Sequence, residues 1–356
     1  MVMTLARTCW PRTGYDEGNR SRVPVRGPEQ GRVDQRITLP FAAGRGAGGG
    51  GGGIVVAADG SWRVAAASTL FALSPLGDLH WSRSLRDGRW TAPYHSAPLA
   101  LNGGDVILTL AHHAVRYDGQ GWLRARLRVA DGLDDSGSAP NLTRDGALLT
   151  GSPIGDVYRL DADGWRSLGA FGYDILPPTL YEDGSLAVAG YAGKGLCRLS
   201  PDGHLRWQAA PRHADLPVTV NRAQVAAVGS VNDHRSWFVD PDGRGLGECG
   251  HAALFAEYPD GGWAALSSGR LARLTPDGHE RWGRPLAVRL TWSTSQPIVD
   301  AAGRIYAATV GGIVCYDSDG RLVFTTALGP SQPYGVSMIA DGTVACLVGS
   351  ELVLLT

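Results

Sequence analysis

The chain has 356 residues, and its 33 lysine and arginine residues nearly balance its 34 aspartate and glutamate residues. This balance excludes a large nucleic-acid-binding surface, because phosphate binding needs a concentrated cationic face. The sequence contains no run of 18 apolar residues, which excludes a membrane-spanning helix. Its five cysteines are odd in number and widely spaced, which is typical of free thiols in a reducing compartment.

Residues 1–32 are rich in arginine, proline and glycine and show little apolar periodicity, so we expect a disordered N-terminal tail. They contain no apolar run of signal-peptide length, and we therefore expect a cytoplasmic protein. We also expect a monomer of bacterial type. Residues 33–39 form an isolated strand, and residues 44–53 form a glycine-rich, flexible linker. No Gly-Lys-Ser/Thr motif follows the linker, which argues against a phosphate-binding loop.

A repeat of about forty residues occupies the remainder of the chain. Its clearest copies are residues 70–81, 196–207, 271–282 and 313–324. Each copy has a strand, a tight turn with glycine where φ must be positive, and a second strand that carries an aromatic residue. Another strand pair precedes each copy, so a unit has four strands, numbered from first (innermost) to fourth. Four strands in about forty residues is the period of a β-propeller blade.

The number of blades follows from the turns. Eight first-to-second turns are recognisable, but only seven third-to-fourth turns, and the last unit has no fourth strand before Thr356. We therefore predict an all-β, eight-bladed propeller of four-stranded antiparallel blades, in one domain over residues 33–356. The strand at 33–39 is expected to supply the missing outer strand and close the ring. A seven-bladed ring with a decorated terminus is the alternative.

The run Leu-Ser-Pro-Asp-Gly-x-x-x-Trp at residues 199–207 resembles the tryptophan-docking repeat of the pyrroloquinoline-quinone (PQQ) type of propeller. In that family a tryptophan on the outermost strand packs between neighbouring blades. Trp81, Trp207 and Trp282 match this position, and Phe324 replaces the indole once. The resemblance covers residues 33–356 and implies the fold. The hallmarks of the quinone dehydrogenases are missing, since the chain has no adjacent cysteine pair, and we expect no PQQ.

The repeat sorts the loops between two faces, because successive turns of a blade alternate between them. The short first-to-second and third-to-fourth turns define the Asp-Gly face. The second-to-third loops and the links between blades are longer, and they define the variable face. Function is expected in variable loops on a rigid scaffold. Six of the nine histidines fall in or beside variable-face loops: His95, His112, His113, His213, His234 and His251.

The candidate site is drawn from these loops. Histidine suits proton transfer at neutral pH, and a neighbouring carboxylate orients the imidazole. The catalytic candidates are His95, Asp174, His234 and His251. The ligand-binding candidates are Tyr94, His112, His113, Asp135, Tyr173, His213, Asp215, Asn232, Asp233, Trp292 and Tyr334. Together these side chains predict a funnel lined with imidazoles, carboxylates and aromatic rings.

This pattern predicts a propeller that binds a small organic molecule and acts as a lyase, cyclase, isomerase or hydrolase without a redox cofactor. Imidazoles from different blades suit a transition metal, but no residues have metal-ligand spacing, so we assign no metal site. The alternative is a protein–protein interaction scaffold without catalysis, for which the tyrosines, tryptophans and arginines of the rim would be binding hot spots. We expect no membrane partner.

Overall fold

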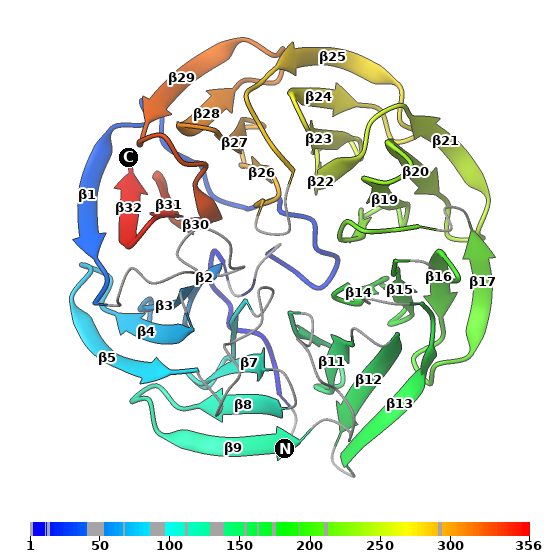
Figure 1. The fold of residues 1–356 in the computed structure, drawn as a ribbon, viewed down its shortest axis with the longest axis horizontal. Coiled ribbons are helices and arrows are strands. Elements are labelled where there is room, and N and C mark those ends of the chain that lie inside the picture. The colour runs from blue at the N-terminus through cyan, green and yellow to red at the C-terminus, as the bar shows by residue number, and fades with distance from the viewer. Residues whose placement is uncertain are drawn as a thin grey trace.

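The computed structural model describes residues 3–10, 12, 15–40, 53–66, 68–85, 97–110, 113–128, 139–152, 155–161, 164–172, 176–191, 193–209, 213–290 and 294–356. These residues form eight four-stranded antiparallel sheets arranged as blades around one axis (Figure 1). They form no helix, and so none that is long and apolar enough to cross a membrane. The predicted eight-bladed propeller is confirmed, and the seven-bladed alternative is wrong.

Seven blades each consist of four consecutive strands, in order from first to fourth. Blade 1 contains β2 (Gly53–Val56), β3 (Trp62–Ala66), β4 (Thr69–Leu73) and β5 (Leu79–Ser84). Blade 2 contains β6 (Leu99–Ala100), β7 (Val106–Leu110), β8 (His113–Tyr117) and β9 (Leu123–Arg128). Blade 3 contains β10 (Asn141–Leu142), β11 (Leu148–Gly151), β12 (Asp156–Asp161) and β13 (Gly164–Ala170). Blade 4 contains β14 (Thr179–Leu180), β15 (Leu186–Val188), β16 (Leu196–Leu199) and β17 (Leu205–Ala209). Blade 5 contains β18 (Thr219–Val220), β19 (Ala226–Ser230), β20 (Arg235–Val239) and β21 (Gly245–Cys249). Blade 6 contains β22 (Ala253–Glu257), β23 (Trp263–Ser267), β24 (Arg270–Leu274) and β25 (Glu280–Pro285). Blade 7 contains β26 (Ile298–Val299), β27 (Ile305–Thr309), β28 (Gly312–Tyr316) and β29 (Leu322–Ala327).

The eighth blade joins the two ends of the chain. It contains β30 (Tyr334–Ala340), β31 (Thr343–Val348) and β32 (Glu351–Leu355), and its fourth strand is β1 (Val33–Thr38). β1 pairs antiparallel with β32, with Ile37 opposite Leu352. Without β1, β32 would expose a row of unpaired amides and carbonyls. The closing strand predicted at residues 33–39 is therefore present. Of the predicted linker at 44–53, only Gly53 lies within the described residues, where it begins β2.

Three tryptophans of the repeat each connect one blade to the next. The indole nitrogens of Trp81, Trp207 and Trp282 donate hydrogen bonds of 2.9, 2.9 and 2.8 Å to carbonyl oxygens in the third-to-fourth turn of the following blade. The rings lie on the turn glycines, since a β-carbon added to Gly121 or Gly320 would approach Trp81 or Trp282 to 2.7 Å. Glycine is required at these two positions for this close approach as well as for φ values of 82° and 74°.

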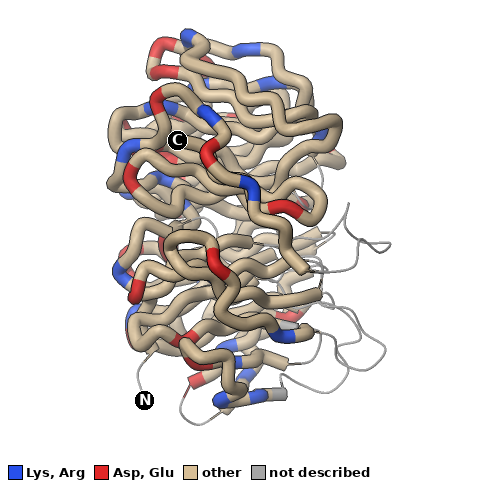
Figure 2. Tube along the Cα trace, turned by 90° about the vertical axis from the view of Figure 1, so that its left-hand side faces the viewer, with Lys and Arg blue, Asp and Glu red and all other residues tan. Residues whose placement is uncertain are grey.

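Arginines on the third strands pair with aspartates near the first-to-second turns. The pairs are Arg116–Asp105, Arg159–Asp145, Arg198–Asp183 and Arg273–Asp260. In each pair both residues belong to the same blade, so these arginines mainly brace a blade internally. Arg198 also donates to the carbonyl of Pro241 in the next blade. Figure 2 shows acidic and basic residues interspersed along the described chain, without a block of one sign.

The N-terminal segment, defined as the described residues 3–10, 12 and 15–32, is hydrogen-bonded to the blades, whereas its composition predicts a disordered tail. Its described backbone follows the innermost strands around the ring, as the blue trace inside the blades shows (Figure 1). Hydrogen bonds of 2.7–2.9 Å join Val56 N to Trp10 O, Ala6 N to Ala100 O, Leu180 N to Glu17 O, Val220 N to Gly18 O, Glu257 N to Arg20 O, Val23 N to Val299 O, and Gly342 N to Arg26 O. In blade 3, Asn141 Nδ2 donates to Glu17 O at 3.0 Å. The segment therefore contacts all eight blades.

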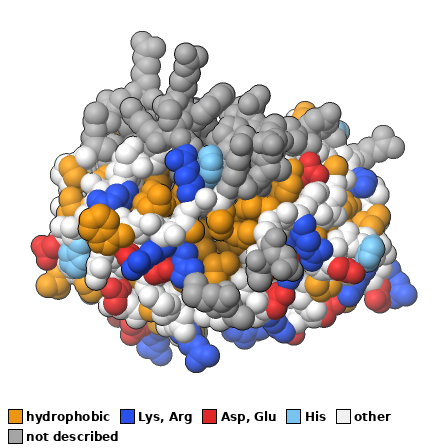
Figure 3. All heavy atoms as spheres, turned by 90° about the horizontal axis from the view of Figure 1, so that it is seen from below, with side chains coloured by type: hydrophobic (Ala, Val, Ile, Leu, Met, Phe, Trp, Pro, Cys, Tyr) orange, Lys and Arg blue, Asp and Glu red, His pale blue; other side chains and the backbone are white. Residues whose placement is uncertain are grey.

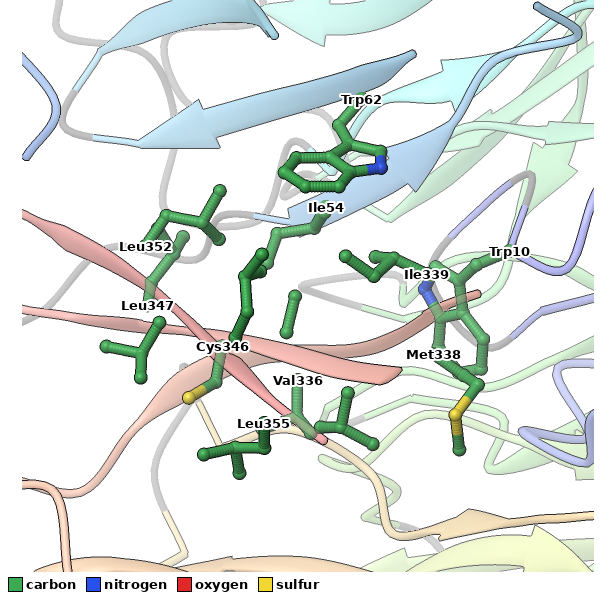
Figure 4. Packing of buried hydrophobic residues seen from close by; sticks show 14 of the residues in the cluster. Trp10, Ile54, Trp62, Val336, Met338, Ile339, Cys346, Leu347, Leu352 and Leu355 are labelled. Atoms are coloured by element: carbon green, nitrogen blue, oxygen red, sulfur yellow. The ribbon is translucent and has the colours of Figure 1, made fainter. Parts of the chain in front are cut away.

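These contacts explain why the segment is ordered. The first strand of each blade has one edge toward the axis, and its amides and carbonyls need partners there. The bonds form where the first strands run into their turns, so the segment covers the Asp-Gly end of the axis. Trp10 is 2% exposed and packs with Ile54, Met338 and Ile339 of blades 1 and 8 (Figure 4). The segment makes these bonds with irregular backbone, and its sequence accordingly shows no strand periodicity.

A buried carboxylate adds charge to the same interface. Glu257, at the end of the first strand of blade 6, is 1% exposed. Its Oε2 lies 3.9 Å from Arg20, 3.8 Å from Arg22 and 3.8 Å from Arg222. Two of these arginines belong to the N-terminal segment, which is therefore attracted to blade 6 as well as hydrogen-bonded to it. Burial raises the pKa of Glu257, although the arginines oppose that change.

We predict that Trp10→Ala lowers the free energy of unfolding by about 3–5 kcal/mol, because it leaves a cavity between the N-terminal segment and blades 1 and 8. Trp122→Ala is the matched control, since Trp122 is 65% exposed; its effect should stay within about 0.5 kcal/mol. Chemical denaturation followed by circular dichroism measures both. Equal effects of the two substitutions would contradict the packing of the N-terminal segment.

We predict an acid-dependent loss of stability through Asp260. Partial burial acts to raise its pKa, but the amide of Gly262 and the charges of Arg273 and Arg281 outweigh burial and lower the pKa. A lowered folded-state pKa gives stability that is present above the unfolded value of about 3.9 and is lost as the pH falls through the folded-state value. Asp260→Asn should therefore reduce the decrease in melting temperature between pH 5 and pH 3, as measured by thermal denaturation. Asp319→Asn, at an exposed turn, should leave that decrease unchanged.

Candidate functional site

The structure describes eight of the predicted site residues. They are His113, His213, Asp215, Asn232, Asp233, His234, His251 and Tyr334. The predicted residues Tyr94, His95, His112, Asp135, Tyr173, Asp174 and Trp292 lie outside the described residues. The described members occur in variable-face loops or at the strand ends beside them. Those that come together do so over blades 4 and 5.

Asp215 and Asn232 are brought into direct contact. Asp215 is 4% exposed, and its carboxylate accepts hydrogen bonds from the Val231 amide at 2.6 Å and from Asn232 Nδ2 at 2.6 Å. It also accepts from the Asn232 amide at 3.3 Å. The link between blades 4 and 5 is thereby fastened to the second-to-third loop of blade 5. Because both oxygens of Asp215 are occupied, this residue supports the loop and is not a free general base.

His213 lies beside an aromatic residue that the sequence prediction did not select. The rings of His213 and Tyr191 are 5.4 Å apart and inclined at 43°. Tyr191 is 39% exposed, whereas His213 is half-buried. Nδ1 of His213 is shielded from solvent and has no hydrogen-bond partner among the described residues. The pair therefore presents the exposed ring of Tyr191 beside a half-buried imidazole whose Nδ1 points away from solvent.

A cation–π contact lies in the adjoining loops. Lys194 Nζ is 4.9 Å from the ring centre of Phe171, and the Lys194 amide donates to the Phe171 carbonyl at 2.9 Å. The Ala214 amide also donates to Gly190 O, at 3.3 Å. These bonds connect three successive loops on the variable face. The signal that would have identified the neighbourhood is Lys194, a lysine in a chain whose basic residues are nearly all arginines.

The catalytic candidates His234 and His251 do not form a catalytic pair with a carboxylate. Both side chains are exposed. No ion pair between described residues involves either imidazole. His234 has a φ of 53°, which marks a tight loop, and the carbonyl of His251 accepts from Ser236 Oγ at 2.8 Å. The neighbouring Asp233 is exposed as well.

The remaining candidates lie in other blades. His113 is half-buried at the start of β8. Tyr334 begins β30, packs against the core of blades 8 and 1, and donates from its hydroxyl to Gly349 O at 3.4 Å. Burial raises the pKa of Tyr334. The contacts of Tyr334 are those of a packing residue at the start of an inner strand.

The described residues contain no group of three or more histidine, cysteine, aspartate or glutamate side chains that could hold a metal ion.

Solved structures of similar fold include two enzymes and BamB. The quinohemoprotein alcohol dehydrogenase from Comamonas testosteroni superposes with a TM-score of 0.72 at 13% identity, over 96% of this chain and 77% of that one. BamB from Moraxella catarrhalis gives 0.65 at 14% identity, over 91% and 96%. Virginiamycin B lyase from Staphylococcus aureus gives 0.56 at 12% identity, over 90% and 98%. No protein-family profile and no curated protein sequence matches the chain.

These similarities establish a fold of the PQQ-like propeller kind, as the repeat predicts. At 12–14% identity these similarities support a conclusion about the fold alone. A dehydrogenase, a lyase and BamB share the architecture, so the activity of this chain has to be argued from its own side chains.

We predict that the Asp215 carboxylate has a structural role, which is to hold the second-to-third loop of blade 5. Asp215→Asn replaces one acceptor oxygen with a donor facing an amide, and it should destabilise the protein by about 1–3 kcal/mol. Amide hydrogen exchange should accelerate at residues 231–234. Asp233→Asn, at an exposed neighbour, is the control and should leave the exchange unchanged. Unaltered exchange in Asp215→Asn would mean that the carboxylate does not hold the loop.

Proposed function

We propose that this propeller binds a small organic molecule on the variable face over blades 4 and 5. The observation that carries the proposal is the contact between Tyr191 and His213, whose rings are 5.4 Å apart. It combines an accessible aromatic ring with a half-buried imidazole, whose Nδ1 is shielded from solvent and has no partner among the described residues. Ligand sites commonly pair apolar or aromatic walls with a few polar groups that orient the ligand.

Lys194 makes an anionic or carbonyl-bearing ligand the preferred class. Its ammonium group belongs to the loop that also carries Tyr191, and described hydrogen bonds tie that loop to the neighbouring links. An aromatic ring, an imidazole and an ammonium group in connected loops suit a planar molecule with a carboxylate or carbonyl substituent. The N-terminal segment contacts the inner strands of all eight blades at the Asp-Gly end, which leaves the variable face as the approach to the axis.

The proposed chemistry is acid–base catalysis by His213, in a lyase, cyclase, isomerase or hydrolase reaction without a redox cofactor. Asp215 does not orient this imidazole, because its oxygens are bonded to the blade 5 loop. The similarity to virginiamycin B lyase supports a lyase reaction on this fold without identifying the substrate. All five cysteines are free, which supports a reducing compartment such as the cytoplasm.

The test is saturation-transfer NMR with a library of small aromatic carboxylates. We predict that binding fragments lose at least about tenfold in affinity with Tyr191→Ala and with His213→Ala, which corresponds to about 1.4 kcal/mol. His204→Ala is the matched control, because His204 is an exposed histidine on the Asp-Gly face. Fragments that bind all three variants and the parent equally would overturn the proposed site.

A catalytic role for His213 needs a separate measurement. For any fragment-derived substrate that the parent converts, His213→Ala should abolish turnover, while Tyr191→Phe should retain it because the aromatic wall remains. If both variants still bind the fragments and the parent converts none of them, the protein binds small molecules without catalysis. That result would contradict the enzymatic part of the proposal.

A further inference from the structure

Lys194 is the only lysine of the chain, since all the other residues among its 33 lysines and arginines are arginines. Figure 3 shows how widely basic side chains are spread over one side of the molecule, and every basic side chain other than Lys194 carries a guanidinium group. Arginine also makes five of the six cation–π contacts between described residues, and Lys194 makes the sixth. The chain therefore uses arginine for positive charge and for ring contacts everywhere except at this one position.

A lysine supplies a property that arginine lacks. A guanidinium group stays protonated in proteins, whereas the amine of a lysine can release a proton and act as a nucleophile. The neutral amine attacks the carbonyl carbon of an aldehyde or ketone and forms a Schiff base. Lys194 is the one side chain of the sequence that carries a primary amine and can form this bond.

The loop that carries Lys194 is held by its backbone. The Lys194 amide donates to Phe171 O at 2.9 Å, and the Lys194 carbonyl accepts from Cys197 Sγ at 3.8 Å. A β-carbon added to Gly193 would lie 2.2 Å from Gly172 Cα, so only glycine permits these two loops to approach so closely. Neighbouring loops therefore fix the backbone of Lys194 and leave its side chain as the part that can turn toward a ligand.

The side chain of Lys194 is exposed and rests on an apolar ring. Its Nζ is 4.9 Å from the ring centre of Phe171, which is 4% exposed and packs in the core of blades 3 and 4. The ring supports the amine from one side only, and a cation–π contact at an exposed site is weak. The amine can therefore leave the ring when another group offers it a bond.

An aromatic surface lies in the same loop as this amine. Tyr191 precedes Lys194 in the loop between the second and third strands of blade 4, and its ring is 39% exposed. The Tyr191 ring contacts His213 at 5.4 Å, and the Ala214 amide bonds the following link to Gly190 O. A planar aromatic molecule that rests on Tyr191 is thereby presented to a loop whose only amine is that of Lys194. A carbonyl substituent on such a molecule is the group with which this amine reacts.

We propose that Lys194 forms a Schiff base with an aromatic aldehyde or ketone that rests on Tyr191. The ammonium group gives one proton to water, and the lone pair of the amine nitrogen then attacks the carbonyl carbon. The resulting carbinolamine loses the former carbonyl oxygen as water, so that a C=N bond replaces the C=O bond and nothing is oxidised or reduced. The inference rests on the ligand site of the proposed function, and it narrows the ligand class of that site to carbonyl compounds.

The probe is para-formylbenzoate together with sodium cyanoborohydride, whose hydride reduces a Schiff base to a stable secondary amine. We expect intact-mass spectrometry to show one adduct on the parent protein, and peptide mapping to locate it at Lys194. The matched control is the double variant Lys194→Arg/Arg321→Lys, which also has one lysine, at a 79%-exposed position in a turn of the Asp-Gly face. Lys194 in the parent should react at least about tenfold faster than the lysine introduced at position 321, because the aromatic surface holds the aldehyde beside the amine.

Two single variants separate the amine from the aromatic surface. Lys194→Arg keeps the positive charge but should abolish labelling, since a guanidinium group forms no Schiff base under these conditions. Tyr191→Ala keeps the amine and should slow its labelling to the rate of the control lysine, whereas Tyr191→Phe should retain the parent rate. Equal labelling rates in the parent and the control overturn the inference, and so does a parent rate that is unchanged by Tyr191→Ala.

The experiment also distinguishes a failure of this inference from a failure of the proposed function. If the parent binds aromatic carboxylates in the NMR measurement but traps the aldehyde no faster than the control, the Schiff base is wrong and the ligand site stands. If the parent neither binds the carboxylates nor traps the aldehyde, the ligand site is wrong and the inference fails with it.

Discussion

The hydrogen-bonding requirement of sheet edges is the constraint on which this structure depends. Every blade has an inner edge toward the axis and an outer edge toward solvent, and the chain must also close on itself. One N-terminal stretch meets two of these requirements. Its described residues bond to the first strands of all eight blades, and it then continues into β1, which pairs with β32. The inner edges and the ring closure are therefore satisfied within one stretch of chain that ends at Thr38.

This arrangement makes the two faces unequal. The N-terminal segment covers the Asp-Gly end of the axis, where the turns are short and braced by arginine–aspartate pairs. The variable face has no comparable cover among the described residues, and its loops hold Tyr191, Lys194 and His213. Asp215 illustrates how the loops of this face are held in place. Its carboxylate fastens the link between blades 4 and 5 to the second-to-third loop of blade 5.

The junctions between blades show how a repeat tolerates variation. Packing on the turn glycine is achieved by tryptophan, phenylalanine, leucine or isoleucine, because the position requires an apolar side chain of sufficient length more than it requires one residue type. At blade 2 the same register position carries Ala125, and Trp165 of blade 3 packs against the apolar cluster shared by blades 2 and 3.

The sequence by itself determined the fold, because the turn glycines and the aromatic residues of the outer strands recur at the period of a blade. Blade number, ring closure and the sorting of loops between two faces follow from that local pattern. Only the tertiary structure decided the rest. The N-terminal segment is held by bonds to strands as far as 330 residues away, as in the contact of Cys9 with Ile339, and such bonds leave no periodic signal. For the same reason the sequence does not show that Asp215 is bonded to a neighbouring loop while Tyr191 is exposed. A loop sequence shows which side chains are polar or aromatic, but the neighbouring loops determine their contacts.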